Sequence, residues 1–304
     1  MRAFLTGATG FVGSWLIRHL EAEGDDVAAL SDGIDVTDTA AVALEITRAR
    51  PDAVYHLAAL THVGRSWEAP EETFRVNATG TLSLLEAVRL LEHPPRVLLV
   101  SSAEVYGPPL GGPVTEESPL RPVTPYAASK VAAEYLGLQA HLGRGIEVIR
   151  ARPFNHVGPG QAEAFVVSAL AKRLVEAEGS GSDEVSVGDL SPARDFTDVR
   201  DVVRAYRLLV EEGTPGDVYN VCSGQAVPIA LVFDQLVGLV RSPVRPVVDP
   251  DLLRPVDVPT LVGDPSKIES LTGWKPEIPL GQTLADVVTD WRARLELAPG
   301  PIAS

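Results

Sequence analysis

Tyr126 and Lys130 are the residues whose types and spacing most directly indicate chemistry in this chain. On a helix, two residues four positions apart lie one turn apart on the same face. There a lysine ammonium can lower the pKa of the phenol, so that the tyrosine exchanges a proton near neutral pH. Lysine is rare here, occurring only at positions 130, 172, 267 and 275, which makes a chance pairing less frequent. The pattern alone is also compatible with a surface lysine that lies beside an unrelated aromatic residue.

A glycine-rich turn near the start of the chain indicates a nucleotide-binding loop. Residues 2–6 form a short apolar run suited to a buried strand, and the apolar spacing from residue 11 predicts a helix. Strand, glycine turn and helix in this order form the context that a dinucleotide-binding loop needs. Gly7 permits the tight turn, Gly10 lets the backbone approach a pyrophosphate, and Gly13 allows close packing of helix on strand. The spacing is G-x-x-G-x-x-G, rather than the commoner G-x-G-x-x-G.

These motifs together resemble the extended short-chain dehydrogenase/reductase family, in its branch that modifies nucleotide sugars. The resemblance spans nearly the whole chain, and its other landmarks are His56-Leu57-Ala58-Ala59, Ser101-Ser102, Arg152-Pro153-Phe154-Asn155, residues 194–199 and Tyr219-Asn220-Val221. The stretches 153–161 and 253–259 look most like members that act on GDP-sugars, specifically GDP-4-keto-6-deoxy-mannose reductases. The resemblance therefore implies NAD(P)H-dependent reduction of the 4-keto group of GDP-4-keto-6-deoxy-D-mannose to GDP-D-rhamnose.

The resemblance assigns catalytic roles to four residues. Tyr126 would protonate the carbonyl oxygen, Lys130 would lower the tyrosine pKa and bond the nicotinamide ribose, and Ser102 would hold the carbonyl oxygen. Glu104 resembles the glutamate with which sugar-nucleotide dehydratases remove a proton next to the ketone. Ala103 stands where dTDP-glucose dehydratases carry an aspartate, whereas GDP-mannose 4,6-dehydratases do not need one. Ser102 as a turn hydroxyl and Glu104 as a plain hydrogen-bonding residue are the structural alternatives.

The expected cofactor is NAD(H) or NADP(H). An acid at the end of the second strand would bond the ribose 2′-hydroxyl and repel a 2′-phosphate. Asp32 lies one place late for this role, Ser31 could contact a phosphate, and no arginine lies nearby in sequence, so the residues favour NAD(H) and leave NADP(H) open. Asp35 is expected at the adenine end, or else is a loop acid. The expected cofactor-binding residues are Gly7, Thr9, Gly10, Phe11, Val12, Gly13, Ser31, Asp32, Asp35, Val36, Leu57, Ala58, Ala59, Tyr126, Lys130 and Pro153.

The expected substrate is a GDP-sugar. Asn155 would bond sugar or phosphate oxygens, Arg194 and Arg254 match a diphosphate, and Lys172 and Asp257 are further candidates, the latter for guanine or its ribose. Each of these could instead be a surface charge. His62, Arg65 and Ser66 could contact the sugar, while His56 is expected to order a strand end. The only asparagines, Asn77, Asn155 and Asn220, all fall at positions that the resemblance marks.

Composition excludes several other classes. The formal net charge of −15 argues against nucleic-acid binding, which needs a basic face. No apolar run is long enough to span a bilayer, and the chain enters a strand at once, so we expect no signal peptide, no membrane partner and a cytoplasmic location. The single cysteine, Cys222, excludes an internal disulfide and fits a reducing compartment. No metal site is expected.

The pattern of elements predicts an α/β fold of the Rossmann type, a doubly wound parallel sheet with a smaller C-terminal substrate-binding lobe. Strands are expected at 2–6, 26–30, 53–57, 96–101, 146–151 and 217–221. Helices are expected at 11–23, 38–49, 71–92, 125–142, 161–177, about 197–211, 228–240 and 282–294. Residues 1–160 would form the dinucleotide-binding domain, with 197–222 returning to it, and 161–196 with 223–304 the substrate lobe. The glycine turn, Ser102 and Asn155 each follow a strand, which predicts one site at the carboxyl edge of the sheet.

Helices 71–92 and 125–142 are apolar on more than one face. One face would pack on the sheet, and relatives of this type pair these helices in a four-helix dimer interface, so we expect a homodimer. A monomeric core covered by the second lobe is the alternative.

Three other functions remain open. A GDP-mannose 4,6-dehydratase would use Glu104 for elimination and hold its cofactor tightly. A nucleotide-sugar epimerase shares the same serine, tyrosine and lysine. A nucleotide-sensing protein without catalysis is disfavoured because Ser102, Tyr126 and Lys130 are all present.

Overall fold

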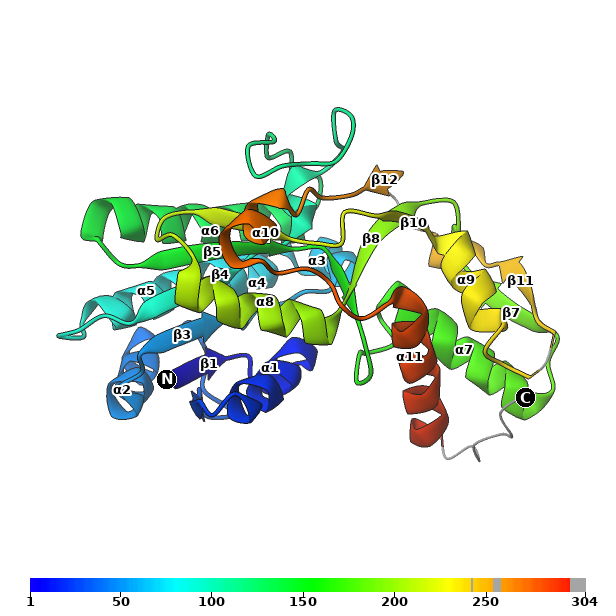
Figure 1. Ribbon diagram of the computed structural model, residues 1–304, viewed down its shortest axis with the longest axis horizontal. Helices are drawn as coiled ribbons and strands as arrows, with labels where there is room; N and C mark the ends of the chain where they lie inside the picture. Colours follow the sequence, from blue (N-terminus) through cyan, green and yellow to red (C-terminus); the bar gives the residue numbers. More distant parts are fainter. Residues whose placement is uncertain (242, 254–257, 296–304) are drawn as a thin grey trace.

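The computed structural model describes residues 1–241, 243–253 and 258–295 of the 304-residue chain. Arg254 and Asp257, two of the expected substrate ligands, lie outside the described residues. Figure 1 shows an elongated molecule, with the N-terminal half around one sheet and the C-terminal elements α7, α9 and α11 gathered at the other end.

A six-stranded parallel sheet forms the larger half, which confirms the predicted fold class. Its order is β2-β1-β3-β4-β5-β9, so the chain moves outward from β1 in both directions, as in a doubly wound fold. Phe4 pairs with Ala28 on one side and Val54 on the other. The strands are β1 Arg2–Thr6, β2 Asp26–Ala29, β3 Ala53–His56, β4 Arg96–Val100, β5 Val148–Pro153 and β9 Val218–Val221.

Helices cover both faces of this sheet (Figure 1). Alternate strand residues point to opposite faces, so Leu5 packs with Leu16 and Leu209 on one face while Phe4 packs with Ile46 and Leu84 on the other. The first face is covered by α1 Phe11–Ala22, α8 Val199–Glu212 and α10 Ser266–Thr272, and the second by α2 Thr39–Ala49, α5 Gly80–Arg89 and α6 Pro125–Arg144.

The helix that bears the proposed catalytic pair has clear start and stop signals. Thr124 caps α6 by accepting a hydrogen bond from the Ala127 N–H, Pro125 occupies the first turn, and Gly145 ends the helix at φ +70°. Tyr126 and Lys130 therefore lie within the first two turns of a 20-residue helix.

The helix predicted at 71–92 is interrupted. It consists of α4 Pro70–Phe74, a five-residue π-helix η1 Arg75–Thr79, and α5. Such π turns widen a helix locally and occur frequently at functional sites. Asn77 lies in this turn and is buried. The shorter elements around this edge of the sheet are α3 Val63–Glu68 and the 3₁₀-helix η2 Ala103–Tyr106.

The second lobe has its own core. Leu174 of α7, Leu236 of α9 and Val288 of α11 pack together with Phe196 and Val187. The helix expected at 161–177 begins later, at Val166, and β6 to β8 and β10 to β12 were not expected. The elements are β6 Asn155–Val157, α7 Val166–Ser180, β7 Glu184–Val187, β8 Ala193–Asp198, β10 Ala226–Pro228, α9 Ile229–Val237, β11 Arg245–Val248, η3 Pro250–Leu252, β12 Thr260–Leu261 and α11 Leu280–Arg294.

These strands form two small sheets. β8 pairs with β6, β10 and β12, while β7 pairs with β11. α10, which the sequence placed with the second lobe, packs instead on α8 and β9. The reason is hydrophobic: Ile268 and the nearby Trp274 are fully buried in the core under α1 and α8.

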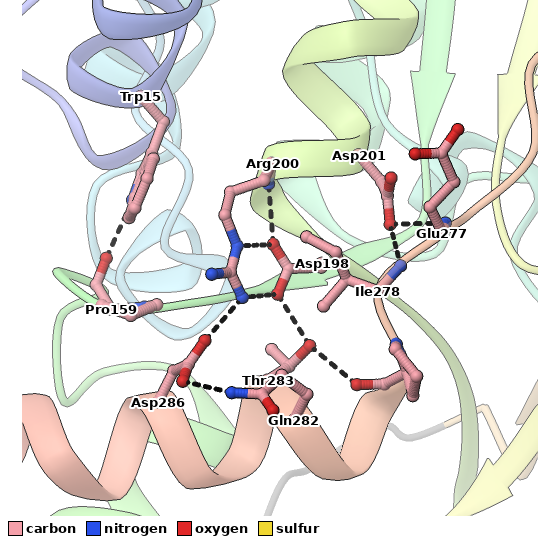
Figure 2. Close-up of polar contacts among 11 residues, drawn as sticks. Trp15, Pro159, Asp198, Arg200, Asp201, Glu277, Ile278, Gln282, Thr283 and Asp286 are labelled. Atoms are coloured by element: carbon pink, nitrogen blue, oxygen red, sulfur yellow. Dashed lines mark hydrogen bonds and ion pairs between the residues drawn. The ribbon is translucent and has the colours of Figure 1, made fainter.

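A polar cluster ties the second lobe to the first (Figure 2). Arg200 of α8 donates to both oxygens of Asp198, each at 2.8 Å, and to Asp286 of α11 at 2.7 Å. Thr283 of α11 donates to the same Asp198 at 2.7 Å. On the α1 side, Trp15 donates from its indole N–H to the Pro159 carbonyl at 2.9 Å, and the Arg200 guanidinium lies 6.0 Å from the indole ring. Among the described helices, none has both the length and the apolar character needed to cross a membrane.

Candidate active site

The glycine turn between β1 and α1 is shaped so that side chains are excluded. Gly7 has φ +73°, and a Cβ there would lie 2.7 Å from the backbone nitrogen of Ala58. A Cβ on Gly13 would lie 2.7 Å from the Ala8 carbonyl oxygen. Gly10 is the exposed N-cap residue of α1. The turn thus leaves backbone N–H groups of a helix N-terminus open, which fits the pyrophosphate of a dinucleotide.

The loop after β3 is fixed beside this turn by buried polar contacts. His56 contacts Thr6 through Nδ1 at 2.7 Å and Thr81 through Nε2 at 3.0 Å, and Thr6 Oγ1 accepts a hydrogen bond from the Ala58 N–H. Burial lowers the pKa of His56 to about 3, so the ring is neutral at physiological pH. The expectation that His56 orders the strand end is confirmed.

Asn77 connects three elements, a role that the sequence did not assign. Its amide accepts from the Leu60 N–H at 2.8 Å and donates to the Leu60 carbonyl at 3.0 Å and to Ser129 Oγ of α6 at 2.9 Å. The π turn aims this side chain at the loop that follows β3. Asn77 therefore holds the 57–60 loop against the helix of Tyr126 and Lys130. The scarcity of asparagine was the only signal in the sequence.

The expected cofactor residues occupy one edge of the sheet. Phe11, at the start of α1, stacks on the ring of His156 in β6, with centroids 6.1 Å apart. Pro153 is the last residue of β5, and the others follow the carboxyl ends of β1, β2 and β3: Thr9, Val12, Ser31, Asp32, Asp35, Val36, Leu57 and Ala59.

Tyr126 is buried at the start of α6 and hydrogen-bonded with Ser102. Burial raises the pKa of the phenol to about 12, the Ser102 hydrogen bond opposes this, and the charge of Glu104 adds to the rise. Ser102 also caps η2 by accepting from the Glu104 N–H at 3.2 Å. Ser102 therefore caps a turn and also contacts the tyrosine, so the turn role does not exclude the expected catalytic one. Ser66 fixes the helix start by accepting from the Tyr126 N–H at 3.2 Å.

Lys130 is buried and anchored at the end of β4. Its ammonium donates to the Val100 carbonyl at the end of β4, at 2.9 Å. Burial lowers the pKa of Lys130 to about 8, against a raising effect of Glu134. The sequence led us to expect a lysine that lowers the pKa of Tyr126. Burial instead dominates both groups, raising the pKa of the phenol and lowering that of the amine.

A buried ionic network joins α6 to the sheet, and the sequence analysis did not predict it. Glu134 of α6 binds the Arg152 guanidinium of β5 through two hydrogen bonds of 2.9 and 2.8 Å. Arg152 also donates to the Tyr106 hydroxyl, which donates to Asn220 Oδ1 of β9 at 2.6 Å. Glu134 is completely buried, and Arg152 nearly so. The network fixes the catalytic helix to strands β5 and β9.

The adenine end of the expected cofactor site is acidic. Asp35 accepts from the Thr37 backbone N–H at 2.9 Å and from Arg75 at 2.8 Å, and these bonds lower its pKa to about 2. Asp32 is exposed. Ser31 donates its hydroxyl proton to Glu45 of α2 at 2.7 Å.

The expected substrate ligands are only partly brought together. Asn155 begins β6, directly beyond β5, and is half-buried. Arg194 is buried in β8, where it donates to the carbonyls of Ala193 at 2.9 Å and Val258 at 2.7 Å. Lys172 binds the carboxylate of Glu163 on the outside of α7 and lies 5.7 Å from the Trp291 ring. His62 caps α3 by accepting from the Arg65 N–H at 2.9 Å, a structural role that had been left open.

Known proteins resemble the chain over almost its full length. The family model described as GDP-mannose 4,6 dehydratase matches residues 31–287. GDP-6-deoxy-D-mannose reductase of Pseudomonas aeruginosa is 37% identical over 97% of this chain and 98% of its own. GDP-mannose 4,6-dehydratase of Vibrio cholerae is 29% identical over 95% of this chain and 93% of its own.

Two solved structures show the same architecture. The Pseudomonas aeruginosa protein RMD, in complex with NADPH, superposes with a TM-score of 0.89 at 36% identity, covering 97% of this chain and 100% of its own. UDP-glucose 4-epimerase of Thermus thermophilus, in complex with NAD, has a TM-score of 0.84 at 30% identity, covering 96% of this chain and 99% of its own. A nicotinamide cofactor is thus common to these structural neighbours.

Proposed function

The chain belongs to the GDP-mannose 4,6-dehydratase family of extended short-chain dehydrogenases/reductases, and we propose that it is the reductase that converts GDP-4-keto-6-deoxy-D-mannose to GDP-D-rhamnose. The observation that carries this proposal is the 37% identity to a GDP-6-deoxy-D-mannose reductase over nearly the full length of both chains. The buried Tyr126, hydrogen-bonded with Ser102 at the carboxyl edge of the sheet, supports it.

Tyr126 and Ser102 are placed for reduction of a carbonyl group. A reduced nicotinamide, when bound, supplies hydride to the carbonyl carbon. Tyr126, whose pKa is raised to about 12, holds its proton at neutral pH and can give it to the carbonyl oxygen as negative charge develops there. Ser102 is placed to donate a second hydrogen bond to the same oxygen. A dehydratase or an epimerase starts by oxidising a hydroxyl, with the tyrosine accepting a proton, so these reactions are distinguished from reduction by their use of substrate and cofactor.

GDP-mannose 4,6-dehydratase is the second candidate. The observation that favours it is Glu104, which directly follows the Ser102-Ala103 pair and is near enough to Tyr126 to raise the tyrosine pKa. A glutamate in this place could remove the proton next to a 4-keto group. The two candidates differ in their use of cofactor, because elimination returns the hydride to the sugar whereas reduction consumes it.

A coupled assay tests the proposal. GDP-mannose is converted to the 4-keto-6-deoxy sugar by a known dehydratase, this protein is added, and the absorbance of NADH or NADPH is followed. We expect a loss of absorbance that depends on both sugar and protein. Conversion of GDP-mannose by this protein alone, with no net loss of absorbance, would establish the dehydratase. If neither absorbance loss nor conversion of GDP-mannose is observed, the GDP-sugar assignment is overturned, and UDP- and dTDP-sugars would be tested next.

We also propose that Asn155 and Arg194 contact the sugar diphosphate, and that NAD(H) is the preferred cofactor. Asn155 lies directly beyond the strand that ends at Pro153, and Arg194 lies in β8, which pairs with the strand of Asn155. Single Asn155→Ala and Arg194→Ala variants should raise the KM for the GDP-sugar while leaving the affinity for nicotinamide nucleotides unchanged. An unchanged KM would remove the residue from this role.

We propose a homodimer that forms through α4, α5 and α6. Phe74, Leu82 and Tyr135 are 48%, 40% and 57% exposed, and together with Leu136 they line one apolar groove between these helices. Apolar surface of this kind is stabilised when a second copy covers it. A Tyr135→Glu variant should halve the molar mass in light scattering, and a wild-type monomer would refute the interface. A cytoplasmic location is proposed with it, because the single cysteine, Cys222, is a buried free thiol.

A further inference from the structure

The contact between Ser31 and Glu45 lies where the ribose of an adenine nucleotide would be recognised. β2 runs parallel to β1, Leu5 pairs with Ala29, and the Leu30 N–H donates to the Leu5 carbonyl. Ser31 therefore lies next to the carboxyl end of β1, from which the glycine turn departs. In dinucleotide-binding folds a residue at this place contacts the ribose 2′ position.

The direction of the Ser31 hydrogen bond decides what this residue can offer a ligand. A serine hydroxyl has one proton and two acceptor lone pairs. Ser31 donates that proton to Glu45 Oε2 at 2.7 Å, and an ionised carboxylate can only accept. Ser31 is consequently left with acceptor capacity. A ribose 2′-hydroxyl can donate to it, but a 2′-phosphate, which has only acceptor oxygens at neutral pH, cannot.

We propose that Glu45 is a cofactor-specificity residue, which selects NAD(H) over NADP(H) by taking the proton of Ser31. The inference rests on the nicotinamide cofactor of the proposed function and deepens it. Glu45 lies on α2, 14 positions after Ser31, and would not touch the nicotinamide or the sugar. Its effect is exerted at the far end of the cofactor from the reacting atoms.

The surrounding charges act in the same direction. Asp32 and Asp35 follow β2, and both would repel the charge of a 2′-phosphate. The two nearby arginines already have partners: Arg75 donates to Asp35 at 2.8 Å, and Arg48 donates to the other oxygen of Glu45 at 3.2 Å. A 2′-phosphate would have to compete with these carboxylates for either guanidinium.

Calorimetric titration of the full-length protein with 2′,5′-ADP and with 5′-AMP, which differ only in the 2′-phosphate, tests the inference without any turnover. Wild type should bind 5′-AMP more tightly than 2′,5′-ADP. Glu45→Ala returns the Ser31 proton to the ligand and removes a negative charge, so the ratio of the two affinities should shift about tenfold toward 2′,5′-ADP. Glu45→Gln keeps a carbonyl oxygen that can accept from Ser31 and should shift the ratio less. NADH and NADPH should show the same pattern.

Two further variants separate the mechanism from a general change of charge. Glu211→Gln removes a carboxylate that pairs with Arg207 at the far end of α8, and should leave the ratio unchanged. Ser31→Ala removes the acceptor, so it should weaken 5′-AMP binding and leave only the smaller part of the Glu45→Ala effect that comes from the lost charge.

The inference would be overturned by a wild-type preference for 2′,5′-ADP, by an unchanged ratio in Glu45→Ala, or by a Glu45 effect of undiminished size without the Ser31 hydroxyl. Failure to bind either adenine nucleotide would also overturn it, because the site would then not hold this part of the cofactor. These outcomes are independent of the sugar assay: binding can discriminate as expected while the GDP-sugar is not turned over, and the reverse can also occur.

Discussion

Replacing Lys130 by methionine should remove turnover and, at neutral pH, stabilise the fold. Lys130 is 6% exposed, and its amine keeps one hydrogen bond, to the Val100 carbonyl. The pKa falls from an ordinary value of 10.5 to about 8 because burial disfavours the charged form. A methionine of similar length fills the same space with no charge to desolvate.

The size of the effect follows from the pKa. The fall from 10.5 to about 8 corresponds to about 3 kcal/mol of unfavourable free energy for the charged amine in the folded chain. Loss of the hydrogen bond to Val100 returns about 1 kcal/mol. The variant should therefore be about 2 kcal/mol more stable than wild type at pH 7.

The dependence on pH has a definite sign. Below pH 8 both the folded and the unfolded wild-type chain carry the charge, and only the folded chain buries it. Between about 8 and 10.5 the folded chain has lost the proton while the unfolded chain still binds it, so wild-type stability rises with pH relative to the variant. The advantage of Lys130→Met should shrink steadily across this window.

Urea unfolding at several pH values, without added nucleotide, measures this difference. Lys275→Met, at a side chain that is 69% exposed, is the matched control and should show no such gain. A Lys130→Met variant that is less stable than wild type at pH 7, or whose advantage does not change up to pH 10.5, would refute the reasoning. Turnover in the coupled assay should be lost in the Lys130 variant and kept in the control.

Three further outcomes are expected. Tyr126→Phe should abolish turnover and leave nucleotide affinity intact, and turnover near wild type would remove Tyr126 from its role as proton donor. Glu134→Gln should destabilise the fold by about 3–5 kcal/mol in urea unfolding, because Arg152 would keep a buried, uncompensated charge; a loss below about 1 kcal/mol would contradict this ionic account. Gly13→Ala should weaken nucleotide binding at least tenfold by calorimetry, because its Cβ would press on the carbonyls of residues 7 and 8; equal affinity would show that the turn can relax.

Local patterns were enough to predict the larger half of the molecule. Apolar runs, glycines and helical spacing involve neighbours in sequence, so β1, the glycine turn and α1 were found to within a residue or two. The spacing of Tyr126 and Lys130 likewise placed both on one helix. Their surroundings could not be predicted in the same way, since a pattern of residue types does not report how deeply a phenol or an amine is buried.

Contacts between distant segments could not be predicted from the sequence. Arg152 and Glu134 lie 18 positions apart, and Asn220 and Tyr106 lie 114 apart, so no periodicity connects them. The short strands of the second lobe were not predicted for a related reason. β6 and β10 have three residues each, and their pairing with β8 depends on tertiary contacts rather than on β-propensity.

Trp15 offers an optical consequence of the junction between the two lobes. Its indole belongs to α1, yet it hydrogen-bonds to Pro159 and has the guanidinium of Arg18 at 5.1 Å and that of Arg200 at 6.0 Å from its ring. Arg200 also binds Asp286 of α11 in the second lobe, so a shift of that lobe would move the guanidinium relative to the indole. The emission of an indole responds to such a change in nearby charge. In a background with the other three tryptophans replaced by phenylalanine, the emission of Trp15 would report whether nucleotide or sugar binding changes this junction.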